Sequence, residues 1–190
     1  MKIALIILLG VYALIANDIK IEGTVYINGK KAQKNMKVSL NDFIVTKKNS
    51  TLTFTIGKDA FMAKENSTLL FNNRNNSKGL NVIKGGVLAV FKTGNNFSLK
   101  TQNMTAGIRG TAVYLESDKD KSYYCTCYGD VDIKSKTKSQ NVKAHHHNMV
   151  WVKEDGSINP AKKMRNHNDE ELRLLEALVG RVPTFDKDKK

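Results

Sequence analysis

The sequence predicts an all-β protein, a sandwich or a closely related wound sheet, followed by one short C-terminal helix. From about residue 19 to residue 152, short runs alternate apolar and polar side chains and are separated by turns rich in Gly, Asn and Asp. No helical pattern lies between these runs. Both prolines come after Asn159, so the predicted strands keep their backbone donors.

The first residues have the pattern of a secretory signal peptide. Met1-Lys2 precedes an apolar run of 14 residues, Ile3 to Ala16, and polar residues follow. The run is shorter than the ~20 apolar residues that cross a bilayer. We therefore expect residues 1–16 to be a signal peptide, cut after Ala16 or Ala13, and the mature chain to be exported without a stable membrane span.

The β domain is expected to cover residues 19–152. In Thr51–Ile56, three threonines alternate with Leu52, Phe54 and Ile56, which predicts a half-buried strand whose threonines face water. Phe97–Lys100 alternates in the same way. Gly129-Asp130 and similar pairs are expected to turn the chain between strands.

Residues 153–190 form a C-terminal extension with a predicted amphipathic helix at about 169–179. Asn168 and Glu171 have the spacing of a capping box, and Gly180 is expected to end the helix. One apolar face is expected to consist of Leu172, Leu175, Leu178 and Val179. A helix of three turns is unstable alone in water, so it either docks on the sandwich, the simpler expectation, or binds a partner.

The formal net charge of +13 raises the question of an anionic partner. Nucleic-acid binding is not expected, because only five of the 31 basic residues are arginines and the lysines are scattered. We interpret the charge as a source of solubility, with an anionic cell-surface polymer as a further candidate partner.

The residues best suited to bind a metal ion or to react chemically are Cys125, Cys127, His145, His146 and His147. Thiolate and imidazole favour zinc and copper, which makes these five residues a candidate metal site. Two alternatives stay open: a redox pair that forms a strained disulfide, or buried thiols with a polar histidine run. Alternation along a strand would place His145 and His147 on one side and His146 on the other. The fourth histidine, His167, is expected to be solvated.

An enzyme is not expected. The sequence has no His-Glu-x-x-His, no Gly-x-Ser-x-Gly and no acid pair framed by apolar residues. Its acidic residues fall mostly at turns and in the predicted helix.

The segment Gly107–Leu115, with Ile-Arg-Gly-Thr at its centre, resembles the signature of the FecR domain family. Four further segments match the family's layout in order, and the resemblance extends from Ile21 to Val152. These segments are Glu22–Val25, Val45–Ile56, Leu80–Leu88 and Tyr128–Ile133.

The resemblance implies a jelly-roll-like β-sandwich that is located in the periplasm. It also implies a binding or signalling module, with an envelope protein or a cell-surface polymer as partner. The best-known members relay an iron–siderophore signal to a cytoplasmic sigma factor. We do not expect that role here, since the cytoplasmic segment that performs it is not recognisable in this sequence. The alternative function is a periplasmic metal-binding (Zn or Cu) or thiol-redox protein.

Overall fold

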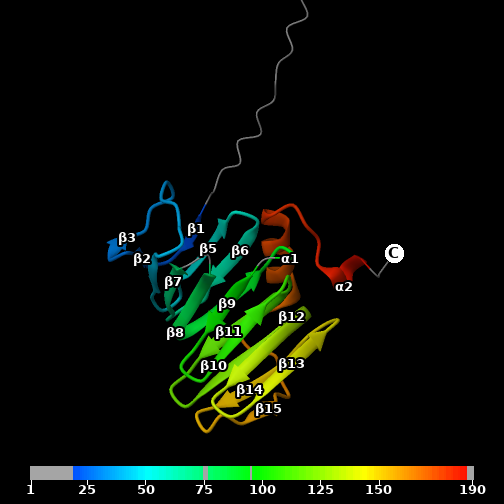
Figure 1. The fold of residues 1–190 in the computed structure, drawn as a ribbon. Coiled ribbons are helices and arrows are strands. Elements are labelled where there is room, and N and C mark those ends of the chain that lie inside the picture. The colour runs from blue at the N-terminus through cyan, green and yellow to red at the C-terminus, as the bar shows by residue number, and fades with distance from the viewer. Residues whose placement is uncertain (1–18, 75–76, 95, 188–190) are drawn as a thin grey trace, which may run out of the picture.

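The computed structural model describes residues 19–74, 77–94 and 96–187, which form two β-sheets and two short helices (Figure 1). The predicted signal peptide, residues 1–16, lies outside the described residues. The strands are β1 (Lys20–Glu22), β2 (Val25–Ile27), β3 (Lys30–Lys31), β4 (Phe43–Thr46), β5 (Thr51–Ile56), β6 (Asp59–Ala63), β7 (Thr68–Arg74), β8 (Ser77–Val90), β9 (Phe97–Lys100), β10 (Met104–Ile108), β11 (Ala112–Ser117), β12 (Lys121–Ser135), β13 (Ser139–Ala144), β14 (Asn148–Lys153) and β15 (Ile158–Pro160). The helices are α1 (Asp169–Leu178) and α2 (Thr184–Lys187).

Two long strands, β8 and β12, run through both sheets and join them. In the first sheet the strand order is β1-β5-β6-β8-β11-β12-β14-β15. In the second sheet it is β3-β2-β4-β7-β8-β9-β10-β12-β13. All neighbours are antiparallel except β8 and β9, which are parallel. The predicted β-sandwich is confirmed.

Gly129 marks the point where β12 passes from one sheet to the other. Its φ is +98°, and a Cβ added there would lie 2.6 Å from Thr111 Oγ1, so a side chain would be both strained and blocked. The sequence-based prediction of a turn at Gly129-Asp130 is wrong. Glycine serves here to bend one continuous strand, and the chain reverses only after Ser135.

The molecule has two apolar layers, one on each side of the first sheet. The larger lies between the sheets and contains a group of stacked and edge-to-face phenylalanines that includes Phe54, Phe61 and Phe71. The smaller covers the outer face of the first sheet and includes Met62, Leu88 and Tyr123 with side chains of the C-terminal extension. The central strands of the first sheet are therefore buried on both faces.

This second layer corrects one expectation about β5. Thr53 was predicted to face water, but it is only 3% exposed. It pairs with Met62 of β6 on the outer face, which the second layer covers. Alternation shows which side chains share a face, but it does not show what packs over that face.

Helix α1 docks on the outer face of the first sheet and lies beside β6 in Figure 1. The predicted capping box is confirmed: Asn168 Oδ1 accepts from Glu171 N, and Glu171 Oε2 accepts from Asn168 N. Leu172 and Leu175 are fully buried. Docking, rather than an exposed recognition helix, is the arrangement found.

Two details of the extension differ from prediction. Leu178 is 47% exposed instead of facing the sheet, because the buried stripe contains Glu176, which binds Tyr128 and Arg181 through its carboxylate. A second short helix, α2, follows α1, and its Phe185 is buried in the outer layer. Within residues 19–74, 77–94 and 96–187, no helix has the length and apolarity needed to cross a membrane.

Candidate functional site

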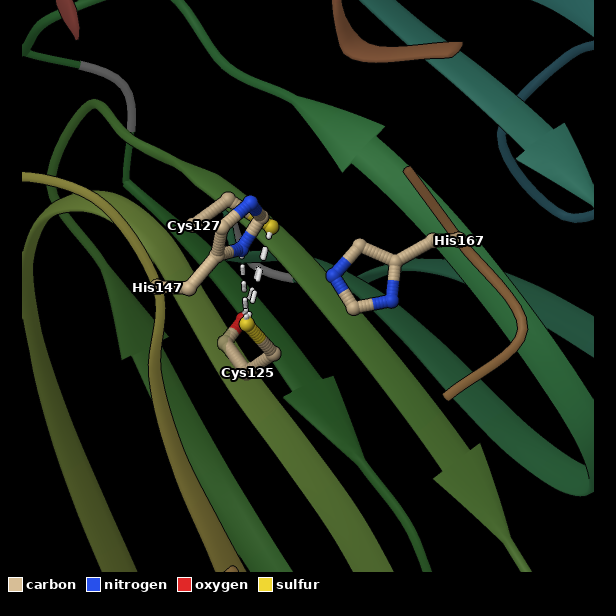
Figure 2. Close-up of side chains that lie close together, drawn as sticks. All are labelled: Cys125, Cys127, His147 and His167. Carbon is tan, nitrogen blue, oxygen red and sulfur yellow. Dashed lines mark hydrogen bonds between the residues drawn. The ribbon is translucent and has the colours of Figure 1, made fainter. Parts of the chain in front are cut away.

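The two thiols lie side by side on the outer face of β12. Cys125 and Cys127 are two residues apart on a strand, so both side chains project from the same face. Both are fully buried by the C-terminal extension, and their Sγ atoms are 3.9 Å apart (Figure 2). The predicted common orientation of the thiols is confirmed.

The turn between β13 and β14 carries the histidine run to the thiols. Strand β13 pairs with the second half of β12, whereas β14 pairs with the first half. The chain must therefore cross from one half to the other next to Cys127, and His147 N donates to Cys127 O over 2.9 Å. The structure thus supplies the proximity that was predicted, by a route other than a turn at Gly129.

His147 adopts a backbone conformation that is uncommon for a residue with a side chain. Its φ is +51°, in the left-handed region, which costs of the order of 1–3 kcal/mol in non-glycine residues unless the surroundings favour it. This conformation ends the strand alternation. The expectation that His145 and His147 point one way and His146 the other does not apply here, because a turn replaces the extended strand.

The three adjacent histidines have different surroundings. His147 Nδ1 lies 3.3 Å from Cys125 Sγ, and its Nε2 lies 2.9 Å from Asp169 Oδ1 at the start of α1. His146 does not approach the thiols closely but binds the same carboxylate, with Nε2 3.0 Å from Oδ1. His145 is exposed and belongs to neither donor group. Of the three predicted histidine ligands, the structure brings only His147 to the thiols.

His167 is the candidate site residue that the sequence analysis missed. It was expected to be solvated, yet it is only 6% exposed and lies near both thiols, opposite His147 in the view of Figure 2. One ligand atom from each of Cys125, Cys127, His147 and His167 lies within 4.8 Å of all the others. The expectation failed because an isolated histidine in a polar stretch belongs to no hydrophobic periodicity and no metal-binding motif that would predict its burial.

A signal for His167 was nevertheless present in the sequence. His167 immediately precedes the cap residue Asn168, and residues in this position often pack against the fourth helical residue, here Leu172. Because Leu172 was predicted to be buried, the same spacing could have indicated a packed residue at position 167.

The imidazole ring of His167 is held in a defined orientation. The ring stacks on Tyr114 with centroids 4.6 Å apart and an interplanar angle of 15°. Its Nδ1 is 2.6 Å from Arg165 O, where it donates as an N–H, because a carbonyl can only accept. Its Nε2 is buried and has no hydrogen-bond partner among the described residues. That tautomer leaves a lone pair on Nε2.

The pKa values of the two thiols shift in opposite directions. The hydrogen bond from Cys127 Sγ lowers the pKa of the Cys125 thiol, burial opposes this effect, and His147 and His167 lower it further. Burial raises the pKa of Cys127, and the neighbouring charge on Cys125 adds to this. The site therefore favours a thiolate at Cys125 and a thiol at Cys127.

A carboxylate supports the ring of His147 from behind. Burial lowers the pKa of His147, but the hydrogen bonds to Cys125 and Asp169 outweigh burial and raise it overall. For Asp169, burial raises the pKa and the bonds to His146 and His147 more than compensate, so the net direction is down. A buried thiolate, an imidazole and a carboxylate in a row can hold a soft or borderline metal ion, or stabilise a reactive thiolate.

The Ile108–Thr111 signature has a structural role in this chain. Arg109 forms an exposed ion pair with Asp132 at 2.8 Å. Gly110 has φ +108°, and a Cβ there would lie 2.4 Å from Thr93 Cα. Thr111 Oγ1 donates to the carbonyl of Tyr128, next to the point where β12 bends. The signature thus fixes the path of the strand that carries the thiols.

Comparison with known proteins identifies the central part of the chain. The family described as FecR protein matches residues 42–132. This part of the chain is a FecR domain. The resemblance predicted from the sequence is confirmed, and the match lies within the predicted span of Ile21 to Val152. Cys125 and Cys127 lie inside the FecR match, whereas His147 and His167 lie beyond its end. No curated protein matches the chain.

Two solved structures share the fold of this chain. Both are crystal structures described as a "putative anti-sigma factor" from Parabacteroides distasonis ATCC 8503, at 2.50 Å and 1.65 Å resolution. The TM-scores are 0.55 and 0.57, each at 9% sequence identity. The alignments cover 64% and 70% of this chain but only 59% and 64% of theirs, so the chain spans less than two thirds of their length.

Proposed function

We propose that this protein is a non-enzymatic binding and signalling module of FecR type that works in the bacterial cell envelope, in the periplasm. The FecR domain at residues 42–132 is the observation that carries the proposal. Export is supported by the apolar run from Ile3 to Ala16, which has the pattern of a signal peptide. The proposal does not include control of a sigma factor.

Localisation tests the envelope part of the proposal. The full chain with a C-terminal tag is expressed in its native host and followed by cell fractionation and N-terminal sequencing. We expect periplasmic protein whose first residue follows Ala13 or Ala16. Full-length protein that keeps Met1 in the cytoplasm would contradict export.

A groove on the described surface offers a place for a partner. It has a volume of about 830 Å³ and is lined by both cationic and anionic side chains, among them Lys64, Lys84, Lys119, Glu65 and Glu116. Mixed charges favour a polar partner, such as an envelope protein segment or a cell-surface polymer, over an apolar small molecule.

Site-specific photo-crosslinking in living cells tests the binding part. A photoreactive residue at Lys84 or Lys119 is expected to capture one partner, whereas the same residue at exposed Lys37, which does not line the groove, is not. Equal capture at all three positions, or no capture at the groove, would argue against a specific partner there.

A second candidate function is favoured by the thiol–imidazole cluster, namely metal binding (Zn or Cu) or thiol redox chemistry with the FecR domain as scaffold. The observation behind it is the burial of both thiols beside His147 and His167. Metal in the purified periplasmic protein without any crosslinked partner would favour this candidate over the signalling module.

A further inference from the structure

The strongest feature that the FecR domain does not explain is the donor cluster on the outer face of the first sheet. We propose that Cys125, Cys127, His147 and His167 form a four-coordinate zinc site that clamps the C-terminal extension onto the FecR domain. The donor atoms, their distances, their burial and the elements that they join support this site, whether or not the protein signals.

In both histidines of the cluster, His147 and His167, one ring nitrogen is hydrogen-bonded to an oxygen and the other points toward the thiols. His167 uses Nδ1 on Arg165 O and leaves Nε2 buried without a partner. His147 uses Nε2 on Asp169 Oδ1 and directs Nδ1 at Cys125. Zinc-binding histidines characteristically donate their second N–H to a carboxylate or a backbone carbonyl, which fixes the tautomer. Both histidines of this cluster meet that condition.

The distances suit a tetrahedral ion. With Zn–S bonds of about 2.3 Å and Zn–N bonds of about 2.0–2.1 Å, tetrahedral geometry gives about 3.8 Å between sulfurs and about 3.6 Å between sulfur and nitrogen. The Sγ atoms of Cys125 and Cys127 are 3.9 Å apart, and Cys125 Sγ is 3.3 Å from His147 Nδ1. The other donor pairs, including those of His167, lie within 4.8 Å, so the donors would have to draw closer together to complete the polyhedron.

Charge and burial favour a divalent ion at this place. Both thiols are fully buried and His167 is 6% exposed, so an isolated charge here would be strongly disfavoured. Two thiolates and two neutral imidazoles around Zn²⁺ give a site with no net charge. Tetrahedral S₂N₂ donor sets are typical of zinc, and a closed set of four protein ligands is typical of a structural site.

A disulfide between the same thiols is disfavoured by the sheet. Cys125 is paired on both sides, with Tyr114 of β11 and with Met149 of β14, so its strand is held extended. Residues i and i+2 of an extended strand have Cα atoms about 6.5–7 Å apart, at or beyond the outer limit for a disulfide. Closing the bond would require the strand to buckle inside a two-sided ladder.

The ligands come from three separate parts of the chain. The cysteines belong to β12, His147 to the β13–β14 turn and His167 to the segment that leads into α1. Asp169, the first residue of α1, holds His147 from behind. An ion at this point therefore connects the FecR domain directly to the extension that covers its outer face.

Cobalt titration of the mature chain under reducing, chelator-treated conditions tests the proposal. We expect one equivalent of Co²⁺ to produce thiolate-to-metal charge-transfer bands and the intense d–d bands of tetrahedral cobalt, and one equivalent of Zn²⁺ to displace it. X-ray absorption of the zinc form should give two sulfur and two nitrogen neighbours at about 2.3 Å and about 2.0–2.1 Å.

Matched variants assign the ligands. Cys127→Ser and His167→Gln should each lower Zn²⁺ affinity more than ~100-fold, beyond the usual loss for outer-shell residues. His145→Gln, which alters a neighbouring histidine outside the donor group, should leave affinity unchanged. His147→Asn should weaken binding while keeping the fold, since Asn tolerates a left-handed backbone.

Three outcomes would overturn the proposal. The first is six-coordinate cobalt spectra or no binding by the folded wild-type chain. The second is an equal effect of His145→Gln and His167→Gln. The third is a periplasmic protein with no free thiol, no metal and a mass lower by two hydrogens, which would establish the disulfide instead. X-ray absorption of the wild type keeps the test valid if a variant fails to fold.

Discussion

Tyr114 and His167 stack face to face with ring centroids 4.6 Å apart, although 53 positions separate them in the sequence. Tyr114 projects from the outer face of β11, next to the strand that carries the thiols. Its hydroxyl donates to Glu116, and the same carboxylate accepts from Arg165 and Asn166, which immediately precede His167. One strand thus positions both the ring of His167 and the backbone that leads to it.

We predict that the aromatic ring of Tyr114, and not its hydroxyl, supports metal binding. Tyr114→Leu removes the stack and should weaken Zn²⁺ affinity about 3- to 10-fold, the equivalent of one aromatic pair. Tyr114→Phe keeps the stack and should stay within about 2-fold of wild type. Competition with a chromophoric chelator measures both. An equal loss in the two variants would mean that the bond to Glu116 is what matters.

Gly86 should tolerate no side chain because of the same tyrosine. A Cβ at Gly86 would lie 2.2 Å from the Tyr114 hydroxyl oxygen and 2.8 Å from Cζ. Gly86→Ala should therefore lower the free energy of unfolding by about 1–3 kcal/mol. Gly107→Ala is the control, since its Cβ would meet nothing nearer than 3.9 Å. Urea unfolding compares them, and similar stabilities would show that the Tyr114 ring moves aside freely.

Asp169 is expected to act as a positioning residue for His147. Asp169→Asn should lower Zn²⁺ affinity about 10- to 100-fold, because the ring loses the carboxylate that fixes its tautomer. Glu170→Gln removes a neighbouring charge from the same helical turn and should leave metal affinity unchanged. Both variants lose a favourable helix-dipole interaction of about 0.3–1 kcal/mol. A stability loss without a difference in metal affinity would therefore argue against positioning.

The docking of α1 predicts a sharp contrast between two adjacent leucines. Leu175 is fully buried against the first sheet, whereas Leu174 is 40% exposed. Leu175→Asp should reduce the free energy of unfolding by more than about 3 kcal/mol, and Leu174→Asp by less than about 1 kcal/mol. Chemical denaturation followed by circular dichroism checks this. Comparable losses would mean that α1 is not held as described.

The thiols of the metal-free protein should titrate far apart. Interaction with Cys127 lowers the pKa of Cys125, despite burial, whereas burial raises the pKa of Cys127. Above its lowered pKa, Cys125 is ionised, so neutral solution should contain about one thiolate per chain, against almost none for free thiols near 8.5. Ultraviolet thiolate absorbance measures this, and Cys125→Ser should abolish it. Ionisation of both thiols together near pH 8.5 would contradict the predicted separation of their pKa values.

The sequence by itself determined the fold class and the start of its C-terminal helix. Alternation in Thr51–Ile56 predicted a strand, and Asn168 with Glu171 predicted where α1 begins. Cys125 and Cys127 were predictable as a pair on one face, because a period of two places them there. These features are set by residues that are close together in the chain, so the local sequence is enough to predict them.

Only the tertiary structure decided which side chains meet. Leu178 is a leucine like Leu175, but it lies outside the buried stripe of the helix, which includes Glu176 instead. His145, His146 and His147 look alike in sequence, yet the turn between β13 and β14 brings only His147 to the thiols. His167 reaches them because it leads into α1, which docks on the outer face of the first sheet, the face from which the thiols project. Strand register and helix docking fix such contacts between distant segments, and neither is encoded by the residues adjacent to the site.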